Sequence, residues 1–162
     1  KNEVLSIDQA ACQIGAVTIP FKARLGTNTQ YENFTSDFNA GLYIGYSPFG
    51  KIRYEYDGSK TSVSQPFNLT FGFTFGFSTE ELDEHNTAWS EKKLPTPQKS
   101  TIGLFSSSLT TMLAYKKFRI GLHLGIDTGI GSKSDYWDHN NQLWLGIGFG
   151  YNLYSGFWKE KE

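Results

Sequence analysis

The chain of 162 residues lacks the features that mark several common protein classes. Cys12 is the only cysteine, so the sequence contains neither a disulfide framework nor a clustered zinc site. It contains no run of about 18 apolar residues, so we expect no membrane-spanning helix. The formal net charge is −1 and no basic run occurs, so nucleic acid is not an expected partner. No cofactor-binding motif is present, and we expect no cofactor and no metal.

Glycine and aromatic residues, by contrast, are frequent. The chain has 17 glycines, and 16% of its residues are aromatic, a pairing that favours glycine-punctuated β-strands over helices. The mean hydropathy of −0.41 does not exclude a membrane β-barrel, because half of each barrel strand faces inward and the loops are polar. The length favours one domain. The chain opens at Lys1 without a leader, so we expect a mature or trimmed form.

The stretch from Gln142 to Tyr154 shows the pattern most clearly. Successive side chains of a strand point to opposite faces, and here one face is apolar throughout while the other is mostly small. The apolar face consists of Leu143, Leu145, Ile147, Phe149, Tyr151 and Leu153. A helix would scatter this face and would carry three interior glycines at roughly 1 kcal/mol each. Bulky residues toward lipid and small ones toward a narrow lumen are typical of a transmembrane β-strand.

The same alternation recurs along the chain. It predicts strands near residues 14–24, 38–47, 52–57, 66–78, 105–115, 118–131 and 142–154. Pro48 predicts a turn at 47–51. Pro20 indicates a strand edge or a bulge, because proline cannot donate a ladder hydrogen bond. Ile102 and Leu104 are out of phase with the residues that follow, which predicts a bulge or a strand start directly after them.

Seven predicted strands leave one strand missing, because bacterial single-chain outer-membrane barrels have an even number. Residues 4–12 are the favoured candidate for the eighth strand, and a cryptic strand within 79–104 is the alternative. The polar segments 79–100 and 132–141 are predicted to be surface loops, the first of them mobile, and to form the recognition surface.

The two faces of these strands have different expected neighbours. Expected to face lipid are Phe67, Leu69, Phe71, Phe73, Phe75, Phe77, Leu145, Ile147 and Phe149. Expected to form a polar network in the lumen are Lys22, Arg24, Arg53, Glu55, Asp57, Asn68, Arg119, His123, Asp127 and Trp144. Burial of an unpaired charge would cost several kcal/mol, so we expect the charged members, which include both signs, to pair across the lumen. Aromatic girdles at the membrane surfaces would come from Tyr136, Trp137, Tyr151, Tyr154 and Trp158.

Two stretches carry a family resemblance. V-T-I-P-F-K-A-R near the start and W-L-G-I-G-F-G-Y at the end resemble the small eight-stranded outer-membrane barrels of the OmpX or OmpA-barrel type, above all the uncharacterised ones common in Bacteroidota. The resemblance implies an all-β fold, namely an antiparallel up-and-down transmembrane β-barrel of eight strands in the bacterial outer membrane. It implies membrane lipid and other outer-membrane proteins as partners. The final strand is similar to the aromatic-terminated assembly signal of such proteins, although eight residues follow Tyr154, which shifts the terminal aromatic to Phe157 or Trp158.

Two other interpretations stay open. A soluble lipocalin-like barrel would turn the phenylalanine-rich faces inward to bind an apolar ligand, but those side chains would overfill a small interior. A lipid A-modifying outer-membrane enzyme would need an acid–base pair. Arg119, His123 and Asp127 share one strand face at a spacing of four, but no His-x-Ser element accompanies them.

The expected function is therefore non-catalytic: a structural or adhesive outer-membrane barrel, or an accessory subunit of a larger outer-membrane complex. The residues Arg119, His123 and Asp127 are expected to fill the lumen. Asp135 and Asp138 could touch a cation, but we expect them to lie in a solvated loop.

Overall fold

The computed structural model describes residues 3–8, 10–25, 33–35, 39–56, 61–64, 68–83, 86–87, 100–115 and 118–157. Only the backbone is described for 3–8, 33–35, 49–56, 61–64 and 157. Apart from one short 3-10 helix, every regular element in these ranges is a β-strand, and all strand pairings are antiparallel. None of these ranges contains a helix that is long and apolar enough to cross a membrane.

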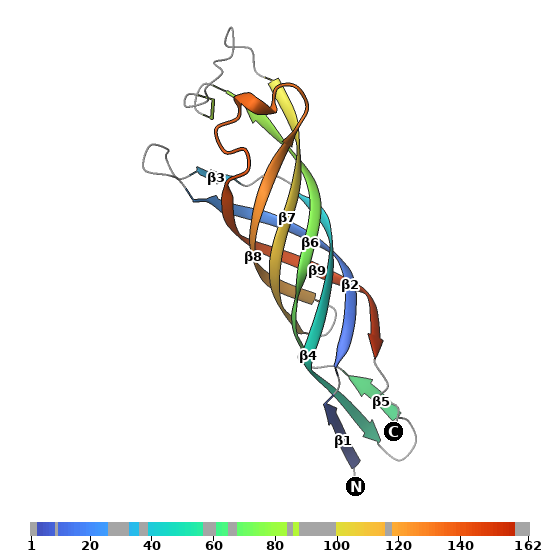
Figure 1. Ribbon diagram of the computed structural model, residues 1–162. Coiled ribbons are helices and arrows are strands. Elements are labelled where there is room, and N and C mark those ends of the chain that lie inside the picture. Colours follow the sequence, from blue (N-terminus) through green and yellow to red (C-terminus); the bar gives the residue numbers. More distant parts are fainter. Residues whose placement is uncertain are drawn as a thin grey trace.

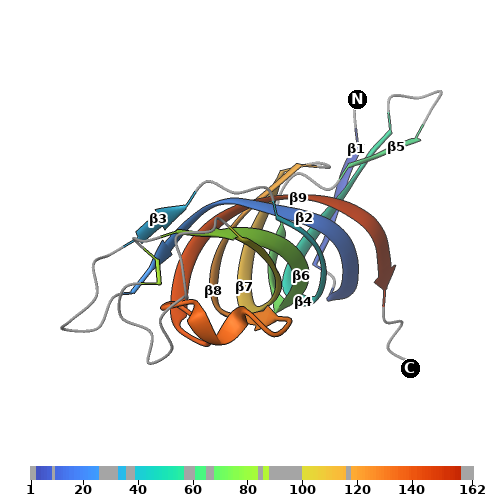
Figure 2. The same cartoon turned by 90° about the horizontal axis from the view of Figure 1, so that it is seen from above.

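Six strands form a closed ring (Figures 1 and 2). In chain order they are β2 (Ala11–Arg24), β4 (Ala40–Tyr56), β6 (Asn68–Leu82), β7 (Ser100–Tyr115), β8 (Phe118–Ile130) and β9 (Leu143–Phe157). Each of the six pairs with the next along the chain. The ring closes because β2 pairs with β4 along one edge and with β9 along the other.

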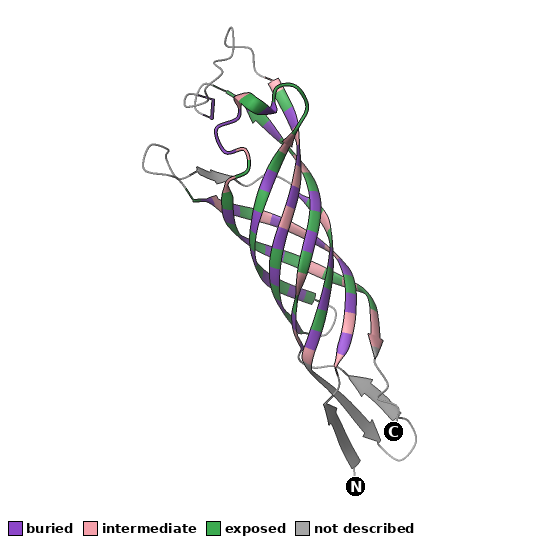
Figure 3. Ribbon diagram, in the orientation of Figure 1, coloured by how far each residue is buried: buried purple, intermediate pink, exposed green. Residues whose placement is uncertain are grey.

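Burial alternates residue by residue along the ring strands (Figure 3). The alternation is strictest on β8, where Arg119, His123 and Asp127 are buried while Leu122 and Leu124 are exposed. Since neighbouring side chains of a strand point to opposite faces, the buried set points into the ring and the exposed set points away from it. The ring therefore displays apolar residues and encloses polar and small ones together with a buried apolar cluster of Val17, Ile19, Tyr43, Met112 and Trp144.

The turn predicted at 47–51 is wrong, because the two strands predicted on either side of it are one continuous strand, β4. The chain does not reverse there. Instead, its register against β6 shifts between Tyr46 and Phe49. A bulge accommodates Pro48, since the extra residue of a bulge stands outside the ladder and its missing N–H breaks no pairing.

Pro20 lies in a second irregularity, as its sequence predicted. The register of β2 against β9 shifts between Thr18 and Phe21. The pairing of β2 with β4 also ends at Thr18, opposite Ala40, and beyond this point β3 (Asn33–Thr35) pairs with the end of β2 in place of β4. The bulge therefore follows directly after the last residue of β2 that pairs with β4.

Beyond the ring, β4 continues between β1 (Glu3–Asp8) and β5 (Thr61–Ser64) in a three-stranded extension, at the lower end of Figure 1. The favoured eighth strand, 4–12, thus corresponds partly to β1, which lies outside the ring. Arg53 and Glu55 pair with β1 and β5 and not with a ring neighbour. Their predicted place in the lumen is wrong, because β4 runs straight past residue 47. Asp57 lies outside the described residues.

The strands around the longest predicted loop extend into it. β6 continues to Leu82 with its alternation intact, so that Glu80 is buried, and β7 already begins at Ser100. Ile102 and Leu104 are buried and pair with β6 without a register shift, so the predicted bulge or strand start after them is wrong. The predicted mobility of this loop concerns residues that lie mostly outside the described ranges.

The connection from β8 to β9 lies at the rim of one end of the ring (Figure 2). It contains the 3-10 helix η1 (Ser134–Tyr136), and Trp137 after it packs with Leu82, Ile102 and Leu104. We call these four apolar residues the end cap. Trp137 is only 2% exposed, so its prediction as a membrane-surface aromatic in a solvated loop is wrong.

Inward-facing glycines make room for the largest interior side chains. Trp144 is fully buried, and Gly125 stands opposite it in the β8–β9 register. A Cβ atom at position 125 would lie 2.5 Å from the indole Cζ2 atom and 2.5 Å from the carbonyl oxygen of Ser107. The close approach of strand and ring therefore requires glycine there.

Replacing Gly125 by alanine is expected to destabilise the ring by about 1–3 kcal/mol, the usual cost of overpacking an interior. Equilibrium urea unfolding measures this loss. Gly103→Ala is the matched control, because its Cβ atom would meet nothing closer than the Cβ atom of Ile130 at 3.8 Å. Equal losses in both variants would contradict the packing described around Trp144.

Candidate functional site

The upper lumen, at the end that carries the end cap, holds a buried ion network. Lys22 Nζ lies 2.8 Å from Asp127 Oδ1, and Arg24 Nη2 lies 3.4 Å from Asp127 Oδ2 and 3.2 Å from Glu80 Oε2. The Ser106 hydroxyl donates to Asp127 Oδ1 at 2.6 Å. The ring thus brings together predicted lumen residues from β2 and β8 that stand more than a hundred positions apart.

Both signs of charge are required in this network, because burying an uncompensated charge costs several kcal/mol. Its members are each at most 5% exposed. Two of them, Glu80 and Ser106, are absent from the predicted network. Glu80 lies in the segment that the sequence predicts to be a loop, yet it continues the even-numbered face of β6 that includes Asn68. The alternation of side chains along β6 could therefore have placed Glu80 inside the ring.

Ser106 and Lys22 raise the question of nucleophilic chemistry. Lys22 Nζ donates to Ser106 Oγ at 3.0 Å, and serine–lysine pairs serve as nucleophile and base in some hydrolases. Here the Nζ atom of Lys22 also donates to both oxygens of Asp127. The serine proton is directed at the same carboxylate. The pair therefore neutralises and fixes a carboxylate, and it lacks a free base.

The middle lumen contains His123 in a chain of hydroxyl groups. Its Nδ1 atom is 3.0 Å from Thr110 Oγ1 and 3.5 Å from Ser108 Oγ, and Thr110 Oγ1 is 2.7 Å from Thr74 Oγ1. Asp127 belongs to the upper network and is not a described partner of His123. The predicted trio of Arg119, His123 and Asp127 is thus distributed over three levels of the lumen.

Cationic side chains stack on aromatic rings at the upper and lower levels. Lys22 Nζ lies 4.4 Å from the ring centre of Trp144, and the Arg24 guanidinium lies 4.9 Å from that of Trp137. At the opposite end, in what we call the lower lumen, the Arg119 guanidinium lies 5.2 Å from the Tyr43 ring. Such stacking typically contributes about 0.5–2 kcal/mol when the groups are desolvated.

Neutral polar side chains surround Arg119 in the lower lumen. Arg119 Nη1 donates to Thr70 Oγ1 at 3.2 Å, and Thr70 Oγ1 donates to Gln13 Oε1 at 2.9 Å. The Ser47 hydroxyl donates to Asn68 Oδ1 and to the carbonyl oxygen of Leu69. The predicted lumen residue Asn68 is thus buried at this end, 6% exposed.

His139 follows the end cap and is also buried. Its Nδ1 atom lies 3.1 Å from Gln142 Oε1. Burial lowers the pKa of His139 below the ordinary value of 6.5, and Arg24 lowers it further, while the bond to Gln142 and the charge of Asp138 oppose the shift. The backbone N–H of Asp138 donates to the carbonyl oxygen of Asn86 at 2.9 Å. The loop predicted to be solvated is thus anchored to the end of β6.

The outer wall carries the residues expected to face lipid. Exposed there are Phe71, Phe73, Phe75, Phe77, Leu145, Ile147 and Phe149, with exposed fractions between 42% and 65%. Leu69 is half-buried, and Phe67 lies outside the described residues. These side chains point outward, and their contact with lipid remains a prediction.

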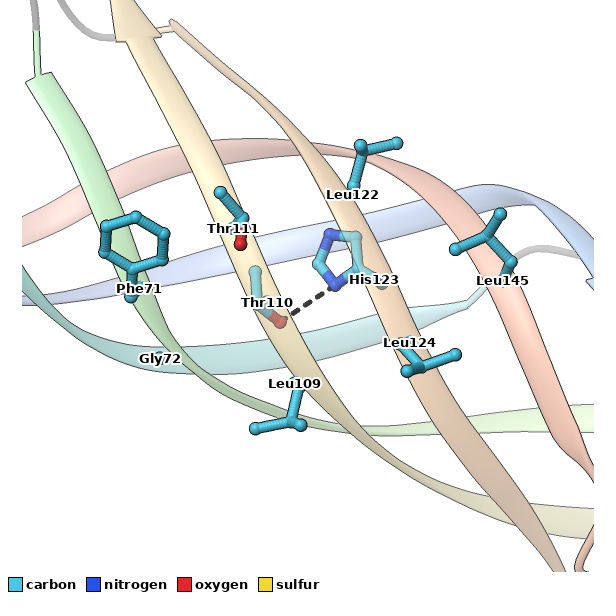
Figure 4. Close-up of a pocket in the computed structure, with 9 residues that line it drawn as sticks. All are labelled: Phe71, Gly72, Leu109, Thr110, Thr111, Leu122, His123, Leu124 and Leu145. Atoms are coloured by element: carbon cyan, nitrogen blue, oxygen red, sulfur yellow. Dashed lines mark hydrogen bonds between the residues drawn. The ribbon is translucent and has the colours of Figure 1, made fainter.

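A depression of about 340 Å³ interrupts the outer wall (Figure 4). Its outward side chains are Phe71, Leu109, Thr111, Leu122, Leu124 and Leu145. Figure 4 shows His123 behind this layer, bonded to Thr110. His123 is 0% exposed, so the depression does not give access to the imidazole.

No part of the described chain brings three or more histidine, cysteine, aspartate or glutamate side chains together in a way that could hold a metal ion. In comparisons with known proteins, no family model and no curated protein matches the chain.

Asp127→Asn is expected to destabilise the protein by about 3–5 kcal/mol, because it leaves Lys22 buried without its carboxylate. Urea unfolding measures the loss. Lys133→Met is the control, since exposed Lys133 bonds only the hydroxyl of Ser100 among the contacts described, and its loss should stay within about 0.5 kcal/mol. A small loss for Asp127→Asn, similar to that of the control, would refute the ion network.

The end region of the ring is expected to lose stability in mild acid. A histidine whose pKa is lowered on folding contributes stability that is complete above its ordinary pKa and is lost as the pH falls below it. Between pH 7 and about pH 5, the wild-type chain should therefore lose more unfolding free energy than His139→Gln, which keeps a polar side chain but cannot titrate. Identical losses in the two proteins would rule out this role for His139.

Proposed function

We propose that this chain is a transmembrane β-barrel of the bacterial outer membrane without catalytic activity. One observation supports it above all. Among the ring-strand side chains that the structure describes, Glu81 is the only charged one on the outer face, whereas Lys22, Arg24, Arg119 and Asp127 are buried inside. In water this distribution would be inverted, since soluble surfaces carry charges on their exposed strands.

The length of the apolar stretch on β8 can be compared with the thickness of the hydrocarbon core of a bilayer, and the two agree. On β8, exposed apolar side chains follow one another from Phe118 to Ile126, about nine residues or roughly 30 Å along the strand. A tilted transmembrane strand needs about 9–11 residues. The wall would consist of the six ring strands, fewer than the eight that the resemblance implies. A narrower barrel accords with an interior filled by side chains.

Tyrosines lie at one border of this wall. Tyr46, Tyr115, Tyr151 and Tyr154 are all exposed, between 45% and 63%, and all lie toward the end opposite the end cap. Tyrosine is enriched at membrane surfaces, where its ring is buried and its hydroxyl group is hydrated. We assign this border to one membrane–water interface.

The polar side chains inside the ring favour a structural, adhesive or accessory role over transport. Buried charged or polar groups lie at the upper end, around His123 and around Arg119. We expect no open path for solutes, so recognition would fall to the connections at the capped end, including residues 132–141.

The two alternatives have less support. A lipocalin-like carrier needs an apolar cavity, but the apolar faces of β6 and β9 point outward. A lipid A-modifying enzyme needs a base within hydrogen-bond reach of its substrate. The imidazole of His123 is sealed behind the outer wall, and we expect His123→Ala to leave lipid A unchanged.

Membrane insertion is tested by spin labels on reconstituted protein in a Cys12→Ser background. A label at Phe73→Cys, in the middle of the outer wall, should be relaxed by lipid-soluble oxygen far more than by a water-soluble nickel chelate. The reverse is expected for the control at Ser132→Cys, which is exposed beyond the wall. Stronger relaxation of the label at position 73 by the nickel chelate than by oxygen would contradict the proposal.

A further inference from the structure

We propose that the lower lumen binds a small monovalent anion, a halide, at Arg119. The side chain is only 4% exposed. Its described contacts are one hydrogen bond to Thr70 Oγ1 and the stacking on Tyr43. Among the described residues it forms no ion pair, and its Nε atom has no hydrogen-bond partner. It is therefore a buried cation without a carboxylate.

The interior carboxylates are engaged elsewhere. Asp127 lies on the same strand as Arg119, about 26 Å further along it, and is bound by Lys22 and Arg24. Glu80 is bound by Arg24 at the same end. Among the described side chains, the two ends of the lumen thus differ in charge balance: the upper end holds both signs, and the lower end holds only the positive charge of Arg119. An isolated buried charge costs several kcal/mol, so a bound anion would relieve it.

A second unpartnered donor lies beside the guanidinium. Gln13 is 0% exposed, and its Nε2 atom has no partner among the described residues. Its Oε1 atom accepts from Thr70 Oγ1, which in turn accepts from Arg119. Thr70 therefore joins the amide to the guanidinium, and the N–H groups left over at this level can only donate. Donors without acceptors suit an anion.

The neighbours of Arg119 favour a small, singly charged ligand. In register beside Arg119 stand the small residues Ala114 on β7 and Gly150 on β9. A Cβ atom at position 150 would already lie 3.6 Å from the Cβ atom of Arg119 and 3.4 Å from the Cε atom of Met112, so a bulky ligand would not fit here. One positive charge is balanced by one negative charge. A phosphate or sulfate would bring about two charges and several oxygens to only two unpartnered donor groups, so a spherical halide is the better match.

The test uses bromide, on the full-length protein in detergent micelles at constant ionic strength with gluconate, a bulky organic anion, as the replacement ion. If bromide binds the folded state, the folded-to-unfolded ratio in urea should rise about tenfold for each tenfold rise in bromide above its Kd. Crystals grown in bromide should give an anomalous peak beside the Arg119 guanidinium. Bromide without effect on unfolding, or a peak in crystals alone (an adventitious ion only), overturns the proposal.

Two variants locate the effect. Arg119→Met removes the cation and should abolish the bromide dependence, while Lys133→Met should keep it. Gln13→Glu supplies a carboxylate from the protein itself, so this variant should be insensitive to bromide and more stable than the wild type in gluconate. If Arg119→Met does not fold, Gln13→Glu decides alone, and an unchanged bromide dependence in it refutes the site. Because the assay needs no bilayer, it is independent of whether the chain inserts into membranes.

Discussion

The structure depends on the double pairing of β2, whose two edges join β4 and β9 and so close the sheet on itself. An open sheet would leave two rows of backbone N–H and carbonyl groups without partners, which costs several kcal/mol per group where no water can reach them. Closure removes both rows. It also creates an inside and an outside, and the alternation of each strand then sorts every side chain into one or the other.

The narrow interior sets strict conditions on what it can contain. The largest fully buried side chain, Trp144, fits because Gly125 stands opposite it on β8. Charged side chains are tolerated where the opposite charge comes from across the ring, as between Lys22 and Asp127. Space and charge are thus balanced between strands and never within one. Arg119 is the exception among the described interior cations, because no described carboxylate pairs with it.

The sequence predicted the strands and their faces well, because a period of two survives in any sheet whatever its topology. It could not predict the path of the chain. The turn at 47–51 rested on Pro48, but proline is equally compatible with a bulge, and tertiary pairing decides between them. Arg53 and Glu55 were misplaced for that reason. Glu80 is not predictable from composition, because the charged residues around it are typical of a loop although the alternation of β6 continues through them. Trp137 is not predictable either, because the position of residues 131–142 depends on long-range packing.

Closure through β2 and β9 also governs how the ring can form. These strands lie near opposite ends of the chain, so the pairing with the highest sequence separation, such as Ala11 with Phe157, cannot form until almost the entire chain is available. Contacts between distant segments carry a large loop-closure entropy and slow the folding of β-proteins. Until that step, the outer apolar faces and two open edges stay exposed together, which is the condition under which chains aggregate. We therefore expect the unfolded chain to need a holding partner for as long as its first and last strands remain apart.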